Sequence, residues 1–134
     1  MTSRQAKQIG DEATDIVIES MRSQPELYGT VRRIDENGDK LLGTDSLHYD
    51  VEYVDMLTNT KRFLEVKSIE GNECQLTPME YKTGKDNPEE YDIAFVRDGK
   101  PYLFKKPFTD KRFQECIWPT EYTINLVNLK LDDK

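Results

Sequence analysis

The chain has 134 residues, of which 36% are hydrophobic and 34% are charged, and its net charge is −7. This length fits one folded domain, and the apolar residues are clustered along the chain, so the composition excludes a disordered polymer. The net negative charge argues against a protein that binds nucleic acid through electrostatic attraction alone. It leaves open a metal-dependent enzyme, in which a bound divalent cation reverses the local charge.

The cysteine content and the hydropathy pattern bear on the cellular compartment of the protein. Its two cysteines, Cys74 and Cys116, form no CxxC pair and no disulfide framework. Neither a signal peptide nor a transmembrane run is present in the sequence. We therefore expect a reduced, cytoplasmic setting and no membrane partner.

The first third of the chain predicts a helix followed by a strand. Residues 3–23 carry apolar side chains at the three-and-four spacing of one helix face: Ile9, Ala13, Ile16, Val17 and Met21. Pro25 ends this helix, because the residue before proline avoids the helical region. Residues 30–34 then predict a short strand, and residues 35–39 a turn rich in Asp, Asn and Gly.

The middle of the chain contains the clearest β pattern. Residues 49–54 and 62–69 both alternate between apolar and polar side chains, and the short polar link between them predicts an antiparallel hairpin. Another short strand is expected at 73–76. Thr77 then predicts the N-cap of a helix, with Pro78 as its first residue and Glu80 as the reciprocal capping partner.

The last part of the chain predicts more strands. Residues 91–97 predict a strongly apolar strand. Asp98-Gly99 is a hairpin turn signal, so residues 101–105 are expected to form the second strand of a hairpin. Residues 113–118 and 121–129 are interpreted as strand-like. The predicted fold class is α+β: a single domain over residues 1–134, with a central mixed β-sheet flanked by helices.

Three charged residues on the predicted hairpin carry the functional interpretation. Residues two apart on a strand share a face, so Glu65 and Lys67 project together while Leu64 and Val66 enter the core. If the preceding strand pairs beside this one, Asp50 reaches the same place. Glu12 lies next to the apolar stripe of the first helix and is a candidate fourth member of the site.

Two carboxylates and one amine in a small volume do not balance each other, because each ion removed from water costs several kcal/mol. A divalent cation resolves that imbalance. Mg²⁺ takes one or two protein carboxylates, keeps several waters and binds substrate phosphate. Lys67 could then orient an attacking water or stabilise charge on phosphate oxygens.

The chain also resembles a known family in the order of its motifs. The segments are Gly10-Asp11-Glu12 on the first helix, Tyr49-Asp50-Val51, Phe63-Leu64-Glu65-Val66-Lys67-Ser68, Leu76-Thr77-Pro78-Met79-Glu80 and Tyr91-Asp92-Ile93-Ala94-Phe95-Val96. Over residues 8–103 they resemble the NO VEIN C-terminal-type domain, in the Mrr-like branch of the PD-(D/E)XK nuclease superfamily. One departure is that Tyr49 stands where the superfamily motif has proline.

The resemblance implies an α/β/α restriction-endonuclease-like fold and hydrolysis of phosphodiester bonds with Mg²⁺ or Mn²⁺, of DNA more often than RNA. It implies that Asp50 and Glu65, together with Val66, hold the metal. It also implies that Lys67 is the motif lysine and Glu12 the first-helix glutamate. Many members of this family are parts of large multidomain proteins.

Other functions stay open at this level. One is a nuclease-fold module without catalysis that binds nucleic acid or protein in a larger assembly. Another is a protein-interaction domain, including a homodimer, that uses the aromatic side chains of Phe113 and Trp118. The basic pairs Arg32-Arg33 and Lys105-Lys106 are interpreted as solvated surface, and the single histidine, His48, as a polar loop residue.

Overall fold

The computed structural model describes residues 3–34, 49–118, 123–127 and 129. Both His48 and the predicted turn at 35–39 lie outside these ranges. The described elements are, in chain order, α1 (Ser3–Arg22), β1 (Tyr28–Arg33), β2 (Val51–Asp55), β3 (Thr60–Ser68), β4 (Glu73–Gln75), α3 (Pro78–Asp86), β5 (Tyr91–Arg97), β6 (Lys100–Phe104), the 3-10 helix η1 (Pro107–Thr109), α4 (Lys111–Gln114), β7 (Ile117–Trp118) and β8 (Thr123–Asn125).

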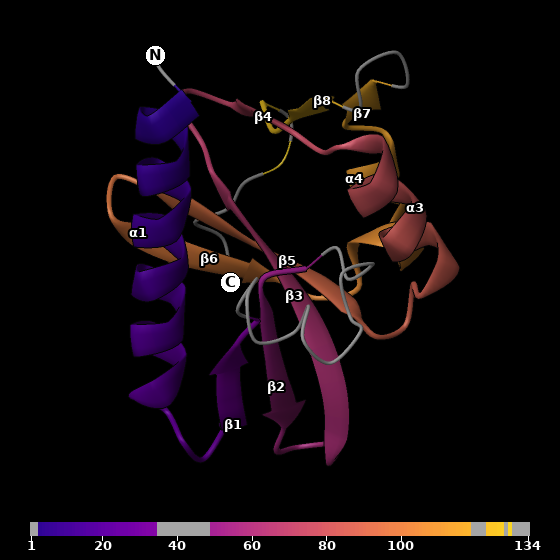
Figure 1. Cartoon of the computed structure of the whole chain (residues 1–134). Coiled ribbons are helices and arrows are strands. Elements are labelled where there is room, and N and C mark those ends of the chain that lie inside the picture. The colour runs from indigo at the N-terminus through magenta and orange to yellow at the C-terminus, as the bar shows by residue number, and fades with distance from the viewer. Residues whose placement is uncertain (1–2, 35–48, 119–122, 128, 130–134) are drawn as a thin grey trace.

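A mixed sheet forms the centre of the described structure. Its five strands follow the order β1-β2-β3-β5-β6. Strands β3 and β5 run parallel, whereas the other neighbouring pairs are antiparallel, including the predicted hairpin of β2 and β3. The connection from β3 to β5 therefore crosses over the sheet, and it carries α3 with it (Figure 1).

Helix α1 covers one face of this sheet. Its buried side chains include Ala13, Val17 and Met21, which pack with Leu64 and other apolar residues of the strands. Ile9 is 38% exposed, so the buried part of the predicted apolar stripe begins one turn later than expected. No helix in the described ranges combines the length and the apolar character needed to cross a bilayer.

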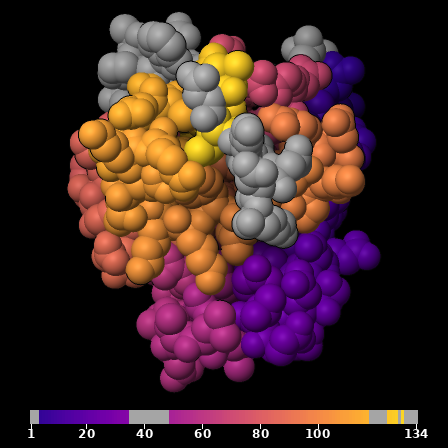
Figure 2. Space-filling model, turned by 180° about the vertical axis from the view of Figure 1, so that it is seen from behind, coloured from indigo at the N-terminus to yellow at the C-terminus, as the bar shows by residue number. Residues whose placement is uncertain are grey.

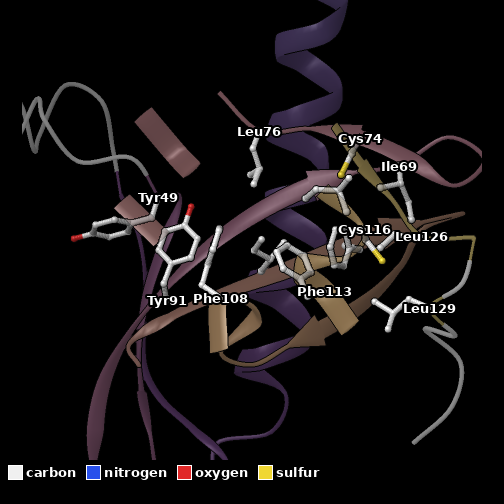
Figure 3. Packing of buried hydrophobic residues seen from close by; sticks show 13 residues of the cluster. Tyr49, Ile69, Cys74, Leu76, Tyr91, Phe108, Phe113, Cys116, Leu126 and Leu129 are labelled. Atoms are coloured by element: carbon white, nitrogen blue, oxygen red, sulfur yellow. The ribbon is translucent and has the colours of Figure 1, made fainter. Parts of the chain in front are cut away.

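The opposite face of the sheet is covered by α3, α4 and a small second sheet. This sheet has three strands in the order β4-β8-β7. Figure 3 shows the core between these layers, with Tyr91 from β5, Phe113 from α4 and Cys74 from β4 in one apolar cluster. The arrangement is a mixed sheet flanked by helices on both sides, which confirms the predicted α+β class (Figure 1).

The C-terminal third differs from the sequence prediction. Residues 111–114 form a helical turn, not the start of a strand, because the carboxylate of Asp110 accepts the N–H of Arg112 at 2.8 Å and caps the helix. Phe113 is fully buried and Phe108 nearly so, so these two aromatics pack the core. The side chain of Trp118 lies outside the described structure. In Figure 2 the C-terminal elements cover the end of the molecule away from the β2–β3 hairpin.

Candidate active site

A cleft of about 630 Å³ opens between α1 and the end of the central sheet at which β2 begins. Helix α1 forms one wall, and the ends of β1, β2 and β3 form the other. Both predicted acids reach this cleft. Its described lining consists of Lys7, Gly10, Asp11, Thr14, Asp15, Arg33, Ile34, Asp50, Glu65 and Val66.

The pairing of β2 with β3 fixes the carboxylate of Asp50. Val51 is the register partner of Leu64, so β3 extends past the start of β2. Asp50, which immediately precedes β2, donates its N–H to the carbonyl of Leu64 at 2.9 Å. Its Oδ2 accepts the N–H of Val66 at 2.8 Å. Asp50 is therefore held against β3 by its backbone and by its side chain.

The carboxyl groups of Asp50 and Glu65 hydrogen-bond to each other. Glu65 is only 4% exposed. Burial, followed by the charge of Asp50, holds the pKa of Glu65 well above its ordinary value. Burial also raises the pKa of Asp50, against the lowering effects of its bonds to Glu65 and Val66. Burial and the charge of the neighbouring acid thus both favour the protonated form of Glu65.

Lys67 projects from the same face of β3 as Glu65. Its Nζ lies 3.7 Å from Oε2 of Glu65 and 2.7 Å from Oε1 of Glu80. Burial lowers the pKa of Lys67, but the charges of Glu65 and Glu80 outweigh it and raise that pKa above its ordinary value. The structure thus brings Asp50, Glu65 and Lys67 together, as the alternation of the hairpin predicted.

Glu80 also belongs to this cluster, although sequence reasoning favoured a capping role for it over contact with a substrate. The predicted capping box is present: Thr77 Oγ1 accepts the N–H of Glu80 at 3.1 Å, and Glu80 Oε1 accepts the N–H of Thr77 at 2.8 Å. The additional contact with Lys67 follows from the β3–β5 crossover, which sets the start of α3 beside β3. Sequence periodicity contains no signal for that packing.

The backbone of Val66 also faces the acid pair. The N–H groups of Phe63 and Ile69 point to the β5 side, where they donate to carbonyls at 2.9 Å each. Peptide groups alternate in direction along a strand, so the N–H and C=O of Val66 point to the β2 side, toward Asp50. The carbonyl of Val66 is therefore placed where a cation held by the two acids could reach it.

The expectation that Glu12 points toward the strand acids is wrong. Glu12 is exposed and lies on a neighbouring face of α1, where its Oε1 accepts a hydrogen bond from Nε2 of Gln8 at 3.1 Å. It lines a separate shallow depression with Gln5, Gln8 and Ile9. The cleft face of α1 instead presents Asp11 and Asp15, because the 3.6-residue period turns Glu12 away from them.

Alternation along β1 separates the two arginines that were interpreted together as solvated surface. Arg32 pairs with Glu52 at 2.7 Å, away from the cleft, whereas Arg33 forms an ion pair with Asp15 at the cleft wall. Lys7 pairs with Asp11 at 3.2 Å on the same wall. Among the described residues, two cations therefore line the cleft, and each is already beside a carboxylate.

A comparison with protein families matches this chain over residues 13–105, more than half of its length, to the model described as "Protein NO VEIN, C-terminal". The chain belongs to this family. The NO VEIN C-terminal match includes Asp50, Glu65, Lys67 and Glu80, whereas Glu12 lies one residue before it. Searches among curated proteins and among solved structures found no match.

The two acids of this NO VEIN C-terminal domain could hold a hard divalent cation. Among the described residues, no group of three or more His, Cys, Asp or Glu side chains is arranged to hold a metal. Mg²⁺ does not require such a cage, because it binds through one or two carboxylates and keeps waters for the remaining positions. Burial and the proximity of two acids raise the pKa values of Asp50 and Glu65, so positive charge beside them would favour their ionised forms.

Proposed function

We propose that this domain is a Mg²⁺- or Mn²⁺-dependent nuclease of the PD-(D/E)XK type that hydrolyses phosphodiester bonds, of DNA in preference to RNA. The observation that carries the proposal is that Asp50 and Glu65 line the same cleft, with the ammonium of Lys67 3.7 Å from Oε2 of Glu65. An acid pair with a neighbouring amine is the set of groups that metal-assisted phosphodiester hydrolysis uses.

Each residue has a role in this proposal. Asp50 and Glu65 would hold the cation, together with the backbone carbonyl of Val66. A bound divalent cation supplies polarisation of the phosphate and a lower pKa for an attacking water. Lys67 would stabilise negative charge that develops on the phosphate oxygens, or orient the water. Arg33 and Lys7, on the cleft wall, would contact the flanking phosphates of the nucleic acid.

The test is cleavage of supercoiled plasmid DNA, with single-stranded RNA in parallel, in the presence of Mg²⁺ or Mn²⁺. We expect Glu65→Gln and Lys67→Ala each to reduce cleavage by at least about a hundredfold, because each removes a group that acts at the reacting phosphate. Circular dichroism checks that both variants fold.

Glu52→Gln is the matched control. It makes the same carboxylate-to-amide change in a buried strand residue that pairs with Arg32, away from the cleft. We expect Glu52→Gln to keep wild-type cleavage. Cleavage that persists unchanged in both site variants would rule out the assignment.

A second function is favoured by the charge of the chain. The net charge is −7, and Lys7 and Arg33, the cations of the described cleft lining, are already paired with carboxylates. A nuclease-fold module without catalysis, acting as a binding domain in a larger assembly, fits these observations. Isothermal titration calorimetry separates the two functions, since this alternative predicts no divalent-cation binding that depends on Asp50 and Glu65.

A further inference from the structure

The closest carboxylate to the ammonium of Lys67 belongs to α3 and not to the strand that carries the lysine. Among the described contacts, Lys67 Nζ lies 2.7 Å from Oε1 of Glu80 but 3.7 Å from Oε2 of Glu65. The side chains of Lys67 and Glu80 are 16% and 17% exposed, so water screens this pair only partly. Lys67 is therefore anchored mainly to Glu80.

Glu80 is held in place independently of Lys67. It is the third residue of α3, and the oxygen that binds Lys67 also accepts the N–H of Thr77 at 2.8 Å. The capping box of Thr77 and Glu80 fixes this side chain at the start of the helix. The position of the ammonium is thereby set by the packing of α3 beside β3.

Without Glu80, the ammonium would have Glu65 as its nearest carboxylate. It would then move from 3.7 Å to hydrogen-bonding distance and cover an oxygen that a cation needs. We propose that Glu80 is a positioning residue, which holds Lys67 away from Glu65 and keeps the acid pair of Asp50 and Glu65 open to a divalent cation. This inference rests on the proposed function.

The test is Mn²⁺ binding to the full chain by isothermal titration calorimetry in a double-mutant cycle. We expect Glu80→Gln to weaken Mn²⁺ binding by about tenfold. The neutral amide holds the ammonium of Lys67 less strongly than the carboxylate does, so Lys67 competes with the cation for Glu65. Lys67→Met alone should not weaken binding. The double variant should bind within about twofold of Lys67→Met, because no ammonium remains to cover Glu65.

The cycle separates positioning from a simple charge effect. If Glu80 acted only by adding negative charge near the cation, Glu80→Gln would weaken binding by the same factor with and without Lys67. That additive result would overturn the inference. Equal Mn²⁺ affinities for wild type and Glu80→Gln would also overturn it while leaving the proposed function standing.

Thr77→Ala is the control for the capping role of Glu80. It removes the hydroxyl that accepts the N–H of Glu80 but leaves the Lys67–Glu80 pair. We expect a lower melting temperature and an unchanged Mn²⁺ affinity. A loss of affinity as large as that of Glu80→Gln would assign the effect to fraying of α3. Absence of Mn²⁺ binding by the wild-type chain would overturn the proposed function, and this inference with it.

Discussion

Asp92 and Glu65 are both buried acids of the central sheet, but only Asp92 has an arginine bound to it. Asp92 is fully buried and accepts two hydrogen bonds from Arg62, at 2.7 and 2.6 Å. It also accepts the hydroxyl of Tyr53 at 2.6 Å and the N–H of Lys106 at 3.0 Å. Asp92 is thus satisfied within the protein, whereas Glu65 lies beside a second acid, Asp50.

This difference predicts opposite roles for the two residues. Asp92→Asn should lower the free energy of unfolding by about 3–5 kcal/mol, because it leaves Arg62 charged and buried without a counter-ion. Urea denaturation measures the effect. The matched control is Asp98→Asn at an exposed turn, which should change stability by less than about 0.5 kcal/mol. Similar values for the two variants would show that the Arg62 pair contributes little.

The two cysteines should be unreactive in the folded protein. Both are free and buried, and burial raises the pKa of Cys74 to about 12. Burial also raises the pKa of Cys116. Since the thiolate is the reactive form, neither residue should react with a maleimide at pH 8 until urea unfolds the chain. Fast labelling of the native protein, followed by mass spectrometry, would contradict this packing.

At the scale of the elements, Gly84 shows how tightly α3 packs on the rest of the core. A Cβ at this position would overlap the ring of Phe108, whereas one at Gly10 of α1 would meet no atom within 4 Å. Gly10→Ala should therefore stabilise the protein by up to about 1 kcal/mol, the usual gain in a helix interior. Gly84→Ala should instead destabilise it. Thermal denaturation of both variants measures the contrast, and stabilisation by Gly84→Ala would contradict it.

The elements that local sequence patterns predicted differ in kind from those that the patterns missed. Local patterns were sufficient for α1, for the β2–β3 hairpin and for the capping box of α3, because each depends on neighbours along the chain. Asp50, Glu65 and Lys67 were found because strand alternation and a hairpin register bring them together. Contacts between distant segments left no periodic signal. The Lys67–Glu80 pair, for example, depends on the parallel β3–β5 crossover. The helical turn at residues 111–114 was missed although its cap, Asp110, is a neighbour along the chain.

At the scale of the whole molecule, the excess of acidic residues works against nucleic-acid binding. The chain has 26 Asp and Glu residues against 19 Lys and Arg residues. At the cleft, Asp11 and Asp15 already neutralise Lys7 and Arg33, and Asp50 and Glu65 add further negative charge. A phosphate would enter this cleft only with a cation to offset the repulsion, so cation and nucleic acid should bind cooperatively.

The same acid pair should make the stability of the molecule depend on pH. In the folded chain the pKa values of Asp50 and Glu65 lie above the 3.8 and 4.5 of the unfolded residues. As pH rises past these values the unfolded state loses its protons first, so the folded state binds more protons and stability falls. The contribution of the two protonated acids to folding stability is therefore complete at low pH, and it is lost as pH rises through their folded-state pKa values.

Urea denaturation of wild type and Glu65→Gln in EDTA, from pH 4 upward, measures this dependence. Wild type should lose stability relative to Glu65→Gln as pH rises, since the amide carries no charge next to Asp50. Mg²⁺ or Mn²⁺ should restore the stability of wild type at neutral pH but leave Glu65→Gln nearly unchanged, because a ligand that binds the folded state stabilises it by mass action. Parallel pH curves in EDTA would mean that the two acids do not interact. A response of both proteins to the cation would place its binding site elsewhere on the surface.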